Sequence, residues 1–494
     1  MKKFMFILLL CVTALSPLLA CSKDAADPVN APRTEPAEGG AATEGASEPA
    51  EISDNLPPDL DFGGETIRVW GREVDSVFYT SAWEFVDEMT GEVFNDALYA
   101  RELAVEGRLG VSIEKTLTTT SYDRAYKAVK AGDDSFDMLF ANAYDVAPHG
   151  LEGIYSDLAH FPYIDYNMPW WPDTIMRDVT INGKTYFITG DITPSVLGFM
   201  NCIFFNKKIA ADHDISGLYE LVFSGKWTFD RYAEAAKNVY KDLNGNGEVD
   251  AEDQFGVTTS DYYDVYFSAF EIPITTTNPD GSLSLALGEK FYEAYSRLRE
   301  FSMDISSLPQ AISNKNESVN YENDVKFFAN GQILFFGGLV RFSDYFRAME
   351  DDYGVLTVPK WDETQKDYHT TSHANYSLLS VPVTVPSERC NMIGAVMEAL
   401  ASEGYKTTTP AYFDSTLKNK YSRDEETLRV LDILRGGLEF QPVMIYYKSM
   451  GDILHLFRYA CYPQNTYENM VSYYEKYSPT FQKAIDKFNE YYLR

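Results

Sequence analysis

The spacing of hydrophobic residues after residue 59 alternates between strand and helix patterns. Glu65–Trp70 alternates polar and apolar positions with period two, and Val111–Leu117 and Phe136–Phe140 predict two more strands. Between them, Trp83–Gly110 and Ser121–Ala131 carry apolar positions at helical spacing. The order strand, helix, strand, helix, strand predicts an α/β sheet with parallel strand pairs.

The rest of the chain continues this mixture of elements. Further strands are expected at Lys184–Thr189, Val196–Phe205, Gln332–Phe336, Tyr353–Val358 and Tyr376–Val383. Further helices are expected at Phe229–Asp242, Gly288–Phe301, Glu322–Ala329, Cys390–Ser402, Arg423–Arg435 and Tyr473–Tyr492. No internal repeat interrupts this order, which favours one large α/β body over a repeat architecture.

The first twenty-one residues have the layout of a bacterial lipoprotein signal. Lys2 and Lys3 precede an apolar stretch, Phe4–Leu15, that is too short to span a membrane. The segment ends at Leu18–Cys21, which reads Leu-Leu-Ala-Cys and resembles a lipobox. The resemblance implies cleavage before Cys21 and lipid, such as palmitate, on its sulfur, with about 0.8 kcal/mol of anchoring per buried methylene. The alternative is an ordinary secretory signal in which Cys21 is incidental.

Residues 21–58 are predicted to be a disordered acidic tether. No aromatic residue occurs between Cys21 and Phe62, and eight acidic residues outnumber Lys23 and Arg33. Such a segment cannot bury enough apolar area to offset the entropy of ordering it, and its like charges keep it extended. We therefore expect a signal peptide at 1–20, a tether at 21–58 and a folded body at 59–494.

Composition narrows the set of partners. The whole chain has 42 Lys and Arg against 74 Asp and Glu, a net charge of −32, which excludes nucleic acid as a partner and disfavours attachment to anionic lipid through charge. Aromatic residues make up 15%, which leaves room for a binding surface built from rings. The charge fits a soluble surface at the outside of a cell.

Motifs for catalysis and for zinc are missing from the sequence. There is no HExxH, GxSxG or GxGxxG, and acidic residues are too frequent to pick out a glycosidase pair. His369 and His373 stand four residues apart, in a segment typical of a loop. Cys202, Cys390 and Cys461 form no CxxC pair, and a disulfide among the three stays open. We expect a protein that is not an enzyme.

One loop follows a template for calcium. Oxygen-bearing side chains occupy its positions 1, 3, 5, 9 and 12, Gly247 stands at the sharp turn, and the residue at position 7 could offer its backbone carbonyl. The expected ligands are Asp242, Asn244, Asn246, Glu248, Asp250 and Asp253. Asp253 replaces the longer Glu usual at position 12, which would loosen coordination. The expectation is a structural calcium ion; the alternative is an Asn/Gly-rich turn without metal.

Nine short motifs follow one another along the chain: Phe136–Asn142, Gly153–Leu158, Pro169–Pro172, Ile181–Tyr186, Phe204–Lys207, Trp227–Asp230, Gln254–Gly256, Phe327–Gly338 and Tyr353–Pro359. In this order they resemble the extracellular solute-binding lipoproteins of ABC importers, family 1. Each is weak alone, and together they span most of residues 60–400. The calcium-like loop is also similar to a segment found in many family members.

This resemblance implies a periplasmic-binding-protein-like fold of type II, with two α/β lobes joined by a hinge. Lobe one would comprise about 59–190 and 375–410, and lobe two about 191–374 and 411–494. A sugar or oligosaccharide would be captured by hinge closure and passed to ABC permease subunits. The protein would be a monomer, lipid-anchored at the extracellular face of the cell membrane. Alternatives are a receptor for peptides or another polar metabolite, a cell-anchored glycoside hydrolase, and an adhesion protein.

By the same resemblance, ligand-binding residues should lie at strand ends and at the crossovers between lobes. The candidates are Trp70, Arg72, Glu73, Asn142, Tyr144, Asp145, Asp191, Arg341, His373, Asn375, Tyr376 and Tyr447. Rings of Trp and Tyr stack on sugar faces, while Asp, Asn and Arg hydrogen-bond hydroxyls. Trp70 and Tyr376 could equally be core residues, and Arg341 a solvated surface charge.

Overall fold

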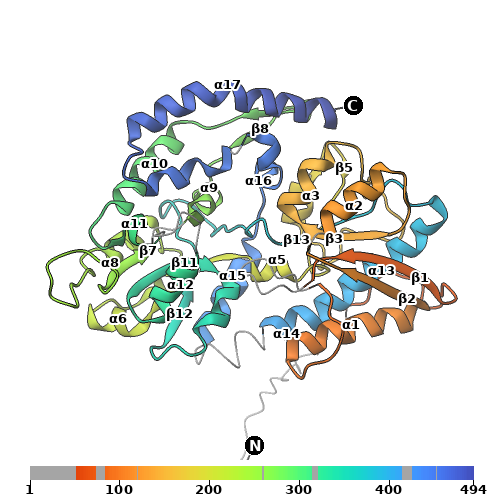
Figure 1. The fold of residues 1–494 in the computed structure, drawn as a ribbon, viewed down its shortest axis with the longest axis horizontal. Helices are drawn as coiled ribbons and strands as arrows, with labels where there is room; N and C mark the ends of the chain where they lie inside the picture. The colour runs from red at the N-terminus through yellow and green to blue at the C-terminus, as the bar shows by residue number, and fades with distance from the viewer. Residues whose placement is uncertain are drawn as a thin grey trace, which may run out of the picture. The chain divides into compact units, whose positions relative to one another are not determined.

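Two separate β-sheets organise the chain in the computed structural model (Figure 1). The structure describes residues 52–73, 84–119, 121–258, 261–313, 321–413, 425–451 and 453–493. Ser53–Arg494 forms one compact unit, which begins six residues before the predicted limit of 59. The predicted signal peptide, the lipidation site Cys21 and tether residues 21–51 lie outside the described residues.

The first sheet has the strand order β13-β3-β1-β2. Its strands are β1 (Glu65–Gly71), β2 (Val111–Leu117), β3 (Met138–Asn142) and β13 (Ser377–Ser380). β1 pairs in parallel with both β2 and β3, as the sequence predicts, and β13 joins β3 antiparallel. A strand from residues 377–380 thus completes a sheet that is otherwise built from residues 65–142.

The second sheet has the order β10-β7-β11-β6-β12. Its strands are β6 (Asn201–Asn206), β7 (Phe255–Thr258), β10 (Ser307–Leu308), β11 (Ile333–Leu339) and β12 (Tyr353–Leu356). β7 pairs in parallel with β10 and β11, whereas β6 runs antiparallel to β11 and β12. Two hairpins lie outside the sheets, β4–β5 (Thr180–Ile181, Lys184–Thr185) and β8–β9 (Thr275–Thr277, Leu283–Leu285).

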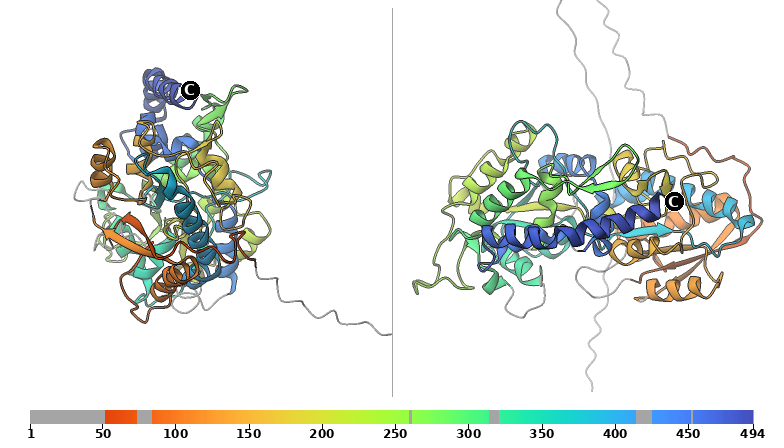
Figure 2. Two further views of the ribbon diagram at one scale, coloured as in Figure 1. Left: turned by 90° about the vertical axis from the view of Figure 1, so that its right-hand side faces the viewer. Right: turned by 90° about the horizontal axis from the view of Figure 1, so that it is seen from above.

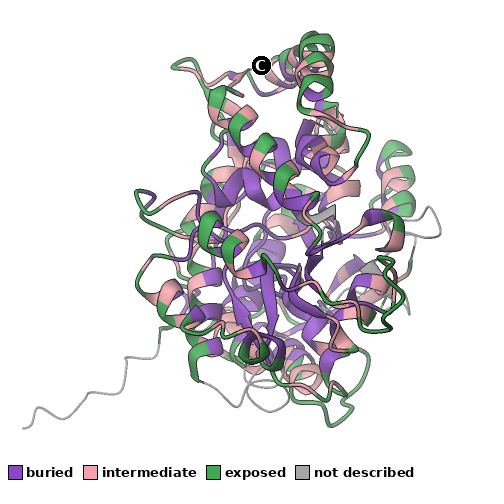
Figure 3. Ribbon diagram, turned by 90° about the vertical axis from the view of Figure 1, so that its left-hand side faces the viewer, coloured by how far each residue is buried: buried purple, intermediate pink, exposed green. Residues whose placement is uncertain are grey.

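Helices surround both sheets, and the strands form the buried interior (Figure 3). The longer ones are α1 (Val93–Leu109), α2 (Ser121–Lys130), α3 (Ala143–Gly150), α4 (Asp173–Val179), α8 (Phe229–Ala236), α10 (Glu289–Ser302), α12 (Tyr321–Ala329), α13 (Cys390–Glu403), α15 (Glu425–Gly436) and α17 (Tyr467–Tyr492). Shorter ones are α5 (Ser195–Gly198), α6 (Lys207–Asp212), α7 (Leu218–Phe223), α9 (Tyr266–Ala269), α11 (Gln310–Ser313), α14 (Thr409–Phe413), α16 (Pro442–Ile445), the π-helix η4 (Gly404–Thr408) and the 3₁₀ helices η1 (Asp261–Val265), η2 (Val340–Phe346), η3 (Ser387–Arg389), η6 (Tyr447–Met450) and η7 (Ile453–Cys461). Among the described residues, no helix is both long and apolar enough to cross a membrane.

A buried carboxylate ties the first sheet to the helix that follows β13. Asp137 is fully buried and accepts hydrogen bonds from Arg68 of β1 and from Arg389 of η3, at 2.7 to 3.1 Å. The Arg389 guanidinium also donates to the Thr66 carbonyl at 2.6 Å. Burial alone would raise the pKa of Asp137, but the hydrogen bonds from both arginines lower it below its ordinary value. Asp137 is therefore ionised in the folded protein near neutral pH.

A second buried carboxylate joins α13 to the loop before α4. Glu398 accepts hydrogen bonds from the indole N–H groups of Trp170 and Trp171, at 3.1 and 2.9 Å. Burial raises the pKa of Glu398 to about 7, against the opposing effect of these donors. On the same helix, a Cβ on Gly394 would stand 1.9 Å from the Pro162 carbonyl oxygen, so only glycine allows this close approach.

Helix α17 runs along one side of the folded body (Figure 2) and contacts elements from both halves of the chain. Near its start, the Tyr474 ring lies 6.0 Å from the Phe291 ring of α10. Near its end, Asn489 exchanges two hydrogen bonds with Leu283 of β9, and the Tyr492 carbonyl accepts from Asn182 of the β4–β5 turn. The helix therefore connects α10 to the hairpins β8–β9 and β4–β5.

The structure corrects several predicted element limits. The helix predicted from Trp83 begins at Val93, because Asp96 accepts from the backbone N–H groups of Thr90 and Gly91 and holds a turn there. The strand predicted from Val196 is a helical turn, α5, followed by β6, since a fully buried apolar run has no distinguishing period. Predicted tether residue Asp54 pairs with Arg108 and is buried, as is Leu56, so the ordered chain begins before 59. Cys202, Cys390 and Cys461 all lie among the described residues, and no disulfide joins them.

Candidate ligand-binding site

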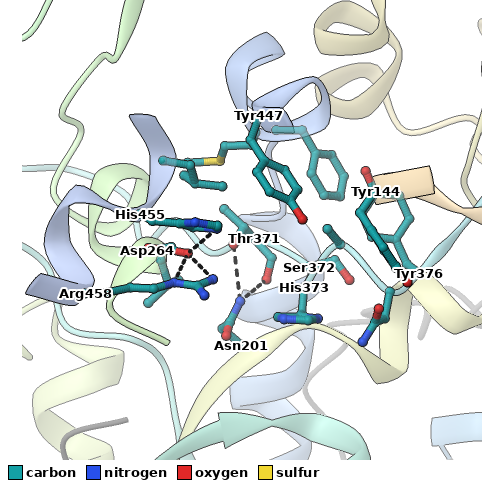
Figure 4. Close-up of a pocket in the computed structure, with 16 residues that line it drawn as sticks. Tyr144, Asn201, Asp264, Thr371, Ser372, His373, Tyr376, Tyr447, His455 and Arg458 are labelled. Carbon is teal, nitrogen blue, oxygen red and sulfur yellow. Dashed lines mark hydrogen bonds and ion pairs between the residues drawn. The ribbon is translucent and has the colours of Figure 1, made fainter. Parts of the chain in front are cut away.

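A cavity of about 280 Å³ lies where both sheets and the segment 440–458 meet. We call it the central cavity (Figure 4). Its lining residues are Tyr144, Asn201, Asp264, Val265, Thr371, Ser372, His373, Ala374, Asn375, Tyr376, Phe440, Met444, Tyr447, Leu454, His455 and Arg458. Polar and aromatic side chains dominate this lining, so the cavity suits a polar molecule with flat apolar faces.

Three groups of elements form the walls. Tyr144 begins α3 beside the first sheet, and Asn201 begins β6 of the second sheet. The remaining wall comes from η1, η6 and η7, which carry Asp264, Tyr447 and the pair His455 and Arg458. Residues that are more than 300 positions apart in the sequence therefore face one space.

The segment 371–376 forms the floor and is fixed to both sides. Isolated β-bridges pair Met200 with Ser372 and Thr370 with Leu438, so three passages of chain run side by side here. Asn201 donates its side-chain amide to the Thr371 carbonyl at 2.8 Å, while the backbone N–H of Tyr144 donates to the Ala374 carbonyl at 3.2 Å. The Asn201 Oδ1 atom is buried and lacks a hydrogen-bond partner among the described residues, which leaves an acceptor near the cavity.

An ion pair occupies one end of the cavity. Arg458 donates from Nε to Asp264 Oδ2 at 2.6 Å and makes a second contact with the same oxygen through Nη2. His455 Nε2 stands 3.8 Å from that oxygen, and its ring lies 5.1 Å from the ring of Tyr447. Figure 4 shows the Tyr447 hydroxyl pointing into the cavity, between this charged end and Tyr144.

Both histidines of the cavity are neutral near pH 7. Burial, and then the positive charge of Arg458, lower the pKa of His373 to about 3. The same two causes, with a contribution from His373, lower the pKa of His455 to about 3. A neutral imidazole presents one donor and one acceptor, so each ring can bond a hydroxyl group in either direction.

Comparison with known proteins gives a match in structure. No family model matches the sequence, and no curated protein does. A sugar transporter from Rhizobium etli in an open conformation superposes with a TM-score of 0.55 at 13% identity, over 86% of this chain and 98% of that one. An ABC substrate-binding protein from Listeria monocytogenes in complex with cycloalternan gives a TM-score of 0.52 at 15% identity, over 86% and 98% of the two chains. Maltose-bound MalE3 of T. maritima gives a TM-score of 0.51 at 15% identity, over 86% of this chain and 99% of that one.

The chain has the fold of an ABC-transporter solute-binding protein. This confirms the predicted fold class, with two α/β lobes built on the two sheets. The predicted sequence limits of the lobes stay a prediction. In the solute-binding fold, the central cavity lies between one sheet and the other, where strand ends and crossovers meet.

The structure brings five of the predicted ligand residues into the central cavity. They are Tyr144, His373, Asn375, Tyr376 and Tyr447. Tyr376, which the sequence left open as a core residue, is almost fully buried, and its ring lies 5.0 Å from the ring of Phe440. It therefore supports the cavity wall more than it offers an open surface.

Four predicted residues lie beside the cavity without lining it. Arg72 donates to the Asn375 carbonyl at 2.9 Å, and Glu73 is exposed next to it. Asn142 donates to Asp145 at 3.2 Å, and Asp145 lies 3.7 Å from Lys448, whose ammonium sits over the Tyr144 ring. Arg72 therefore holds the backbone at Asn375, and Asp145 holds Lys448 over the Tyr144 ring.

Three predicted residues stand elsewhere. Trp70 is buried in the core beside the first sheet, and its ring stacks on the Phe136 ring with 4.5 Å between the ring centres. Asp191 is buried and accepts from Arg435 of α15 at 3.1 and 3.2 Å; burial raises its pKa to about 6, and Arg435 opposes the rise. Arg341 is buried rather than surface-exposed, and its guanidinium lies 4.7 Å from the Phe199 ring centre. The cavity does not include these side chains.

Sequence reasoning missed the charged end of the cavity. Asn201, Asp264, His455 and Arg458 were not among its candidates, nor were the apolar Met444 and Leu454. One signal was present. In Ile453–Cys461, which is mostly apolar, His455 and Arg458 stand three residues apart and so share one helix face.

The predicted calcium loop forms a compact turn. Asp242 accepts from the backbone N–H groups of Gly245 and Gly247, at 2.6 and 2.8 Å, and both glycines have positive φ. Asp250 Oδ2 accepts from the side-chain amide of Asn246 at 2.7 Å. Among the described residues, no three His, Cys, Asp or Glu side chains are grouped to hold a metal. Calcium here would therefore need Asn oxygens and the Glu248 carbonyl in addition to the Asp carboxylates, and it stays a prediction.

Proposed function

We propose that this protein binds a sugar in the central cavity and delivers it to an ABC importer. The observation that carries the proposal is the cavity itself, because it is walled by both lobes and combines tyrosine rings with neutral hydrogen-bonding groups. Similar folds in the comparisons hold maltose and cycloalternan. Closure of the lobes on a hinge would enclose the sugar and create the form that a permease recognises.

The volume of the cavity favours a small ligand. At about 280 Å³ it lies near the lower limit of the roughly 300–1,000 Å³ usual for small-molecule sites. A ligand of one or two sugar rings suits this space better than a longer oligosaccharide.

The described lining favours binding over hydrolysis. Most glycosidases use two carboxyl groups at a fixed separation. Asp264 is the one carboxylate among the described residues that line the cavity, and Arg458 is bound to it. We therefore propose a binding protein that makes and breaks no covalent bond in its ligand.

A binding screen tests this function. Purified protein should show a raised melting temperature with at least one neutral mono- or disaccharide, and calorimetry should then give a Kd in the micromolar range or tighter. Peptides, amino acids and maltotetraose belong in the same screen. A response to peptides alone would reject the sugar proposal, and release of product from a bound glycoside would reject the binding-only role.

Anchoring and delivery complete the proposal. The lipobox-like sequence ending at Cys21 supports a lipid anchor at the extracellular face of the cell membrane. The residues between it and Ser53 would act as a tether, which lets the folded unit reach permease subunits while attached. Mass spectrometry of the membrane fraction tests the anchor, and an acyl-free Cys21 would contradict it.

We also propose that the Asp242–Asp253 loop binds one calcium ion. Millimolar calcium should release or absorb heat in calorimetry and raise the melting temperature by about 2 °C or more. Asp242→Ala should abolish both effects. Asp280→Ala is the matched control, because Asp280 caps the exposed β8–β9 turn in a similar way. Equal responses from both variants, or no response from the unmodified protein, would show that the loop is a metal-free turn.

A further inference from the structure

One ion pair carries the formal charge of the central cavity. Among the described lining residues, Asp264 and Arg458 are the charged ones, since His373 and His455 are neutral near pH 7. Arg458 and Asp264 are joined at 2.6 Å, and their side chains are 23% and 14% exposed. The lining therefore offers donors and acceptors without a net charge.

Two further cations, Lys448 and Arg72, lie behind the lining residues. Lys448 lies 3.7 Å from Asp145, so that pair is also compensated. Arg72 reaches the cavity wall at the Asn375 carbonyl and is not among the residues that line the cavity. Arg458 is the one cation among the described residues that line the cavity, and the Asp264 carboxylate lies beside it (Figure 4).

We propose that Asp264 sets the ligand class of the cavity by neutralising Arg458, so that neutral sugars bind and anionic sugars such as uronates are rejected. This inference rests on the proposed function. A uronate carboxylate placed against Arg458 would give up its water and meet the carboxylate of Asp264 next to the same guanidinium. A sugar hydroxyl carries no such cost, and it can donate to Asp264 while accepting from Arg458.

Removal of the Asp264 charge should reverse this preference. In Asp264→Asn, Arg458 keeps its positive charge at the cavity end but loses the carboxylate that faces it in the unmodified protein. A guanidinium binds carboxylates through paired, charge-assisted hydrogen bonds, so a uronate gains the place that Asp264 leaves. Asp264 would then be a specificity-determining residue, since its loss changes which ligand class the cavity accepts.

Calorimetry with matched sugars tests the inference. The probes are D-glucose with D-glucuronate, and D-galactose with D-galacturonate, because each pair differs at one carbon. In the unmodified protein, each uronate should bind at least tenfold more weakly than its neutral partner. In Asp264→Asn, affinity for at least one uronate should rise tenfold or more over the unmodified protein. Uronate binding equal to that of the neutral sugar, or no gain in the variant, would overturn the inference.

Control variants assign the gain to Arg458. The double variant Asp264→Asn with Arg458→Gln should lose the gained uronate affinity, because the cation is gone. Asp212→Asn removes the same charge from an exposed pair with Lys208 on α6 and should leave uronate affinity unchanged. Melting curves will show whether Asp264→Asn disturbs folding. If it does, Asp264→Ser replaces it in the test, because serine also removes the charge and has a smaller side chain.

The two failures can be told apart. If no neutral sugar in the wider screen binds the unmodified protein, the proposed function fails, whatever the variants do. If neutral sugars bind but Asp264→Asn gains no uronate affinity, the proposed function stands and the role of Asp264 is wrong.

Discussion

Asp137→Ala should lower the free energy of unfolding by about 3 kcal/mol, since removing one partner of a buried ion pair leaves the other uncompensated. Two arginines are affected at once. Arg68 and Arg389 lose a carboxylate that is fully buried, and the link between β1 and the start of α13 is reduced to the contacts of Arg389 with Glu65 and the Thr66 carbonyl. Urea denaturation followed by tryptophan fluorescence measures the effect, provided that the transition is cooperative.

The control is close by in the sequence. Asp134 is an exposed carboxylate in the loop before β3, and Asp134→Ala should change stability by less than about 0.5 kcal/mol. A similar loss of stability in both variants would mean that any negative charge in this region is stabilising, and that the Arg68–Asp137–Arg389 contact has no special effect.

The effect of Asp137→Ala should also depend on pH. Arginine hydrogen bonds hold the pKa of Asp137 below its ordinary 3.8 in the folded state, so the folded protein releases this proton more readily than the unfolded chain. The stabilisation is therefore fully present above the unfolded pKa and is lost as pH falls through the folded pKa. The stability difference between the two proteins should be constant from about pH 5 to 7 and shrink below about pH 4. A difference that does not change down to pH 3 would contradict this account.

Tyr447→Ala should weaken binding of the best sugar from the screen at least tenfold, which corresponds to about 1.4 kcal/mol. The ring stands against His455, and its hydroxyl points into the central cavity, so alanine removes both a stacking face and a hydrogen-bonding group. Calorimetry gives the Kd, and the melting temperature without sugar shows whether the fold is intact.

Two comparisons sharpen this result. Tyr447→Phe keeps the ring and should lose less affinity than alanine. Tyr477→Ala removes a half-buried tyrosine of α17 that packs on Tyr473 outside the cavity, and it should leave the Kd unchanged. If Tyr447→Ala binds as tightly as the unmodified protein, the central cavity is not the sugar site.

Local patterns predicted elements best where one face of the element is exposed. β2 has its predicted limits, because Val111 and Ile113 alternate with exposed Ser112 and Glu114. The run 195–206 is buried throughout, so its pattern could not separate a helical turn from a strand. α8 ends six residues early, because Lys237 leaves the helix and Asn238 takes a positive φ.

The sequence predicted those residues of the candidate site that lie next to the ends of sheet strands. Tyr144 follows β3, and Asn375 and Tyr376 precede β13. They were predicted because ligands of open α/β sheets bind beside the ends of strands. Asp264, His455 and Arg458 sit on short 3₁₀ helices, which have no sheet to orient them and no sustained period in sequence. Their convergence depends on packing between η1 and η7, which only the folded chain specifies.

The wall formed by η6 and η7 comes from the last part of the chain, after all the strands of the two sheets. Every described strand of both sheets lies before residue 381, whereas Tyr447, His455 and Arg458 follow it by more than 60 positions. A chain synthesised or trimmed to about residue 436 would keep all those strands and still lack one wall of the cavity. Under the proposed function, ligand binding would therefore distinguish a chain that includes residues 447–458 from a shorter one that retains both sheets.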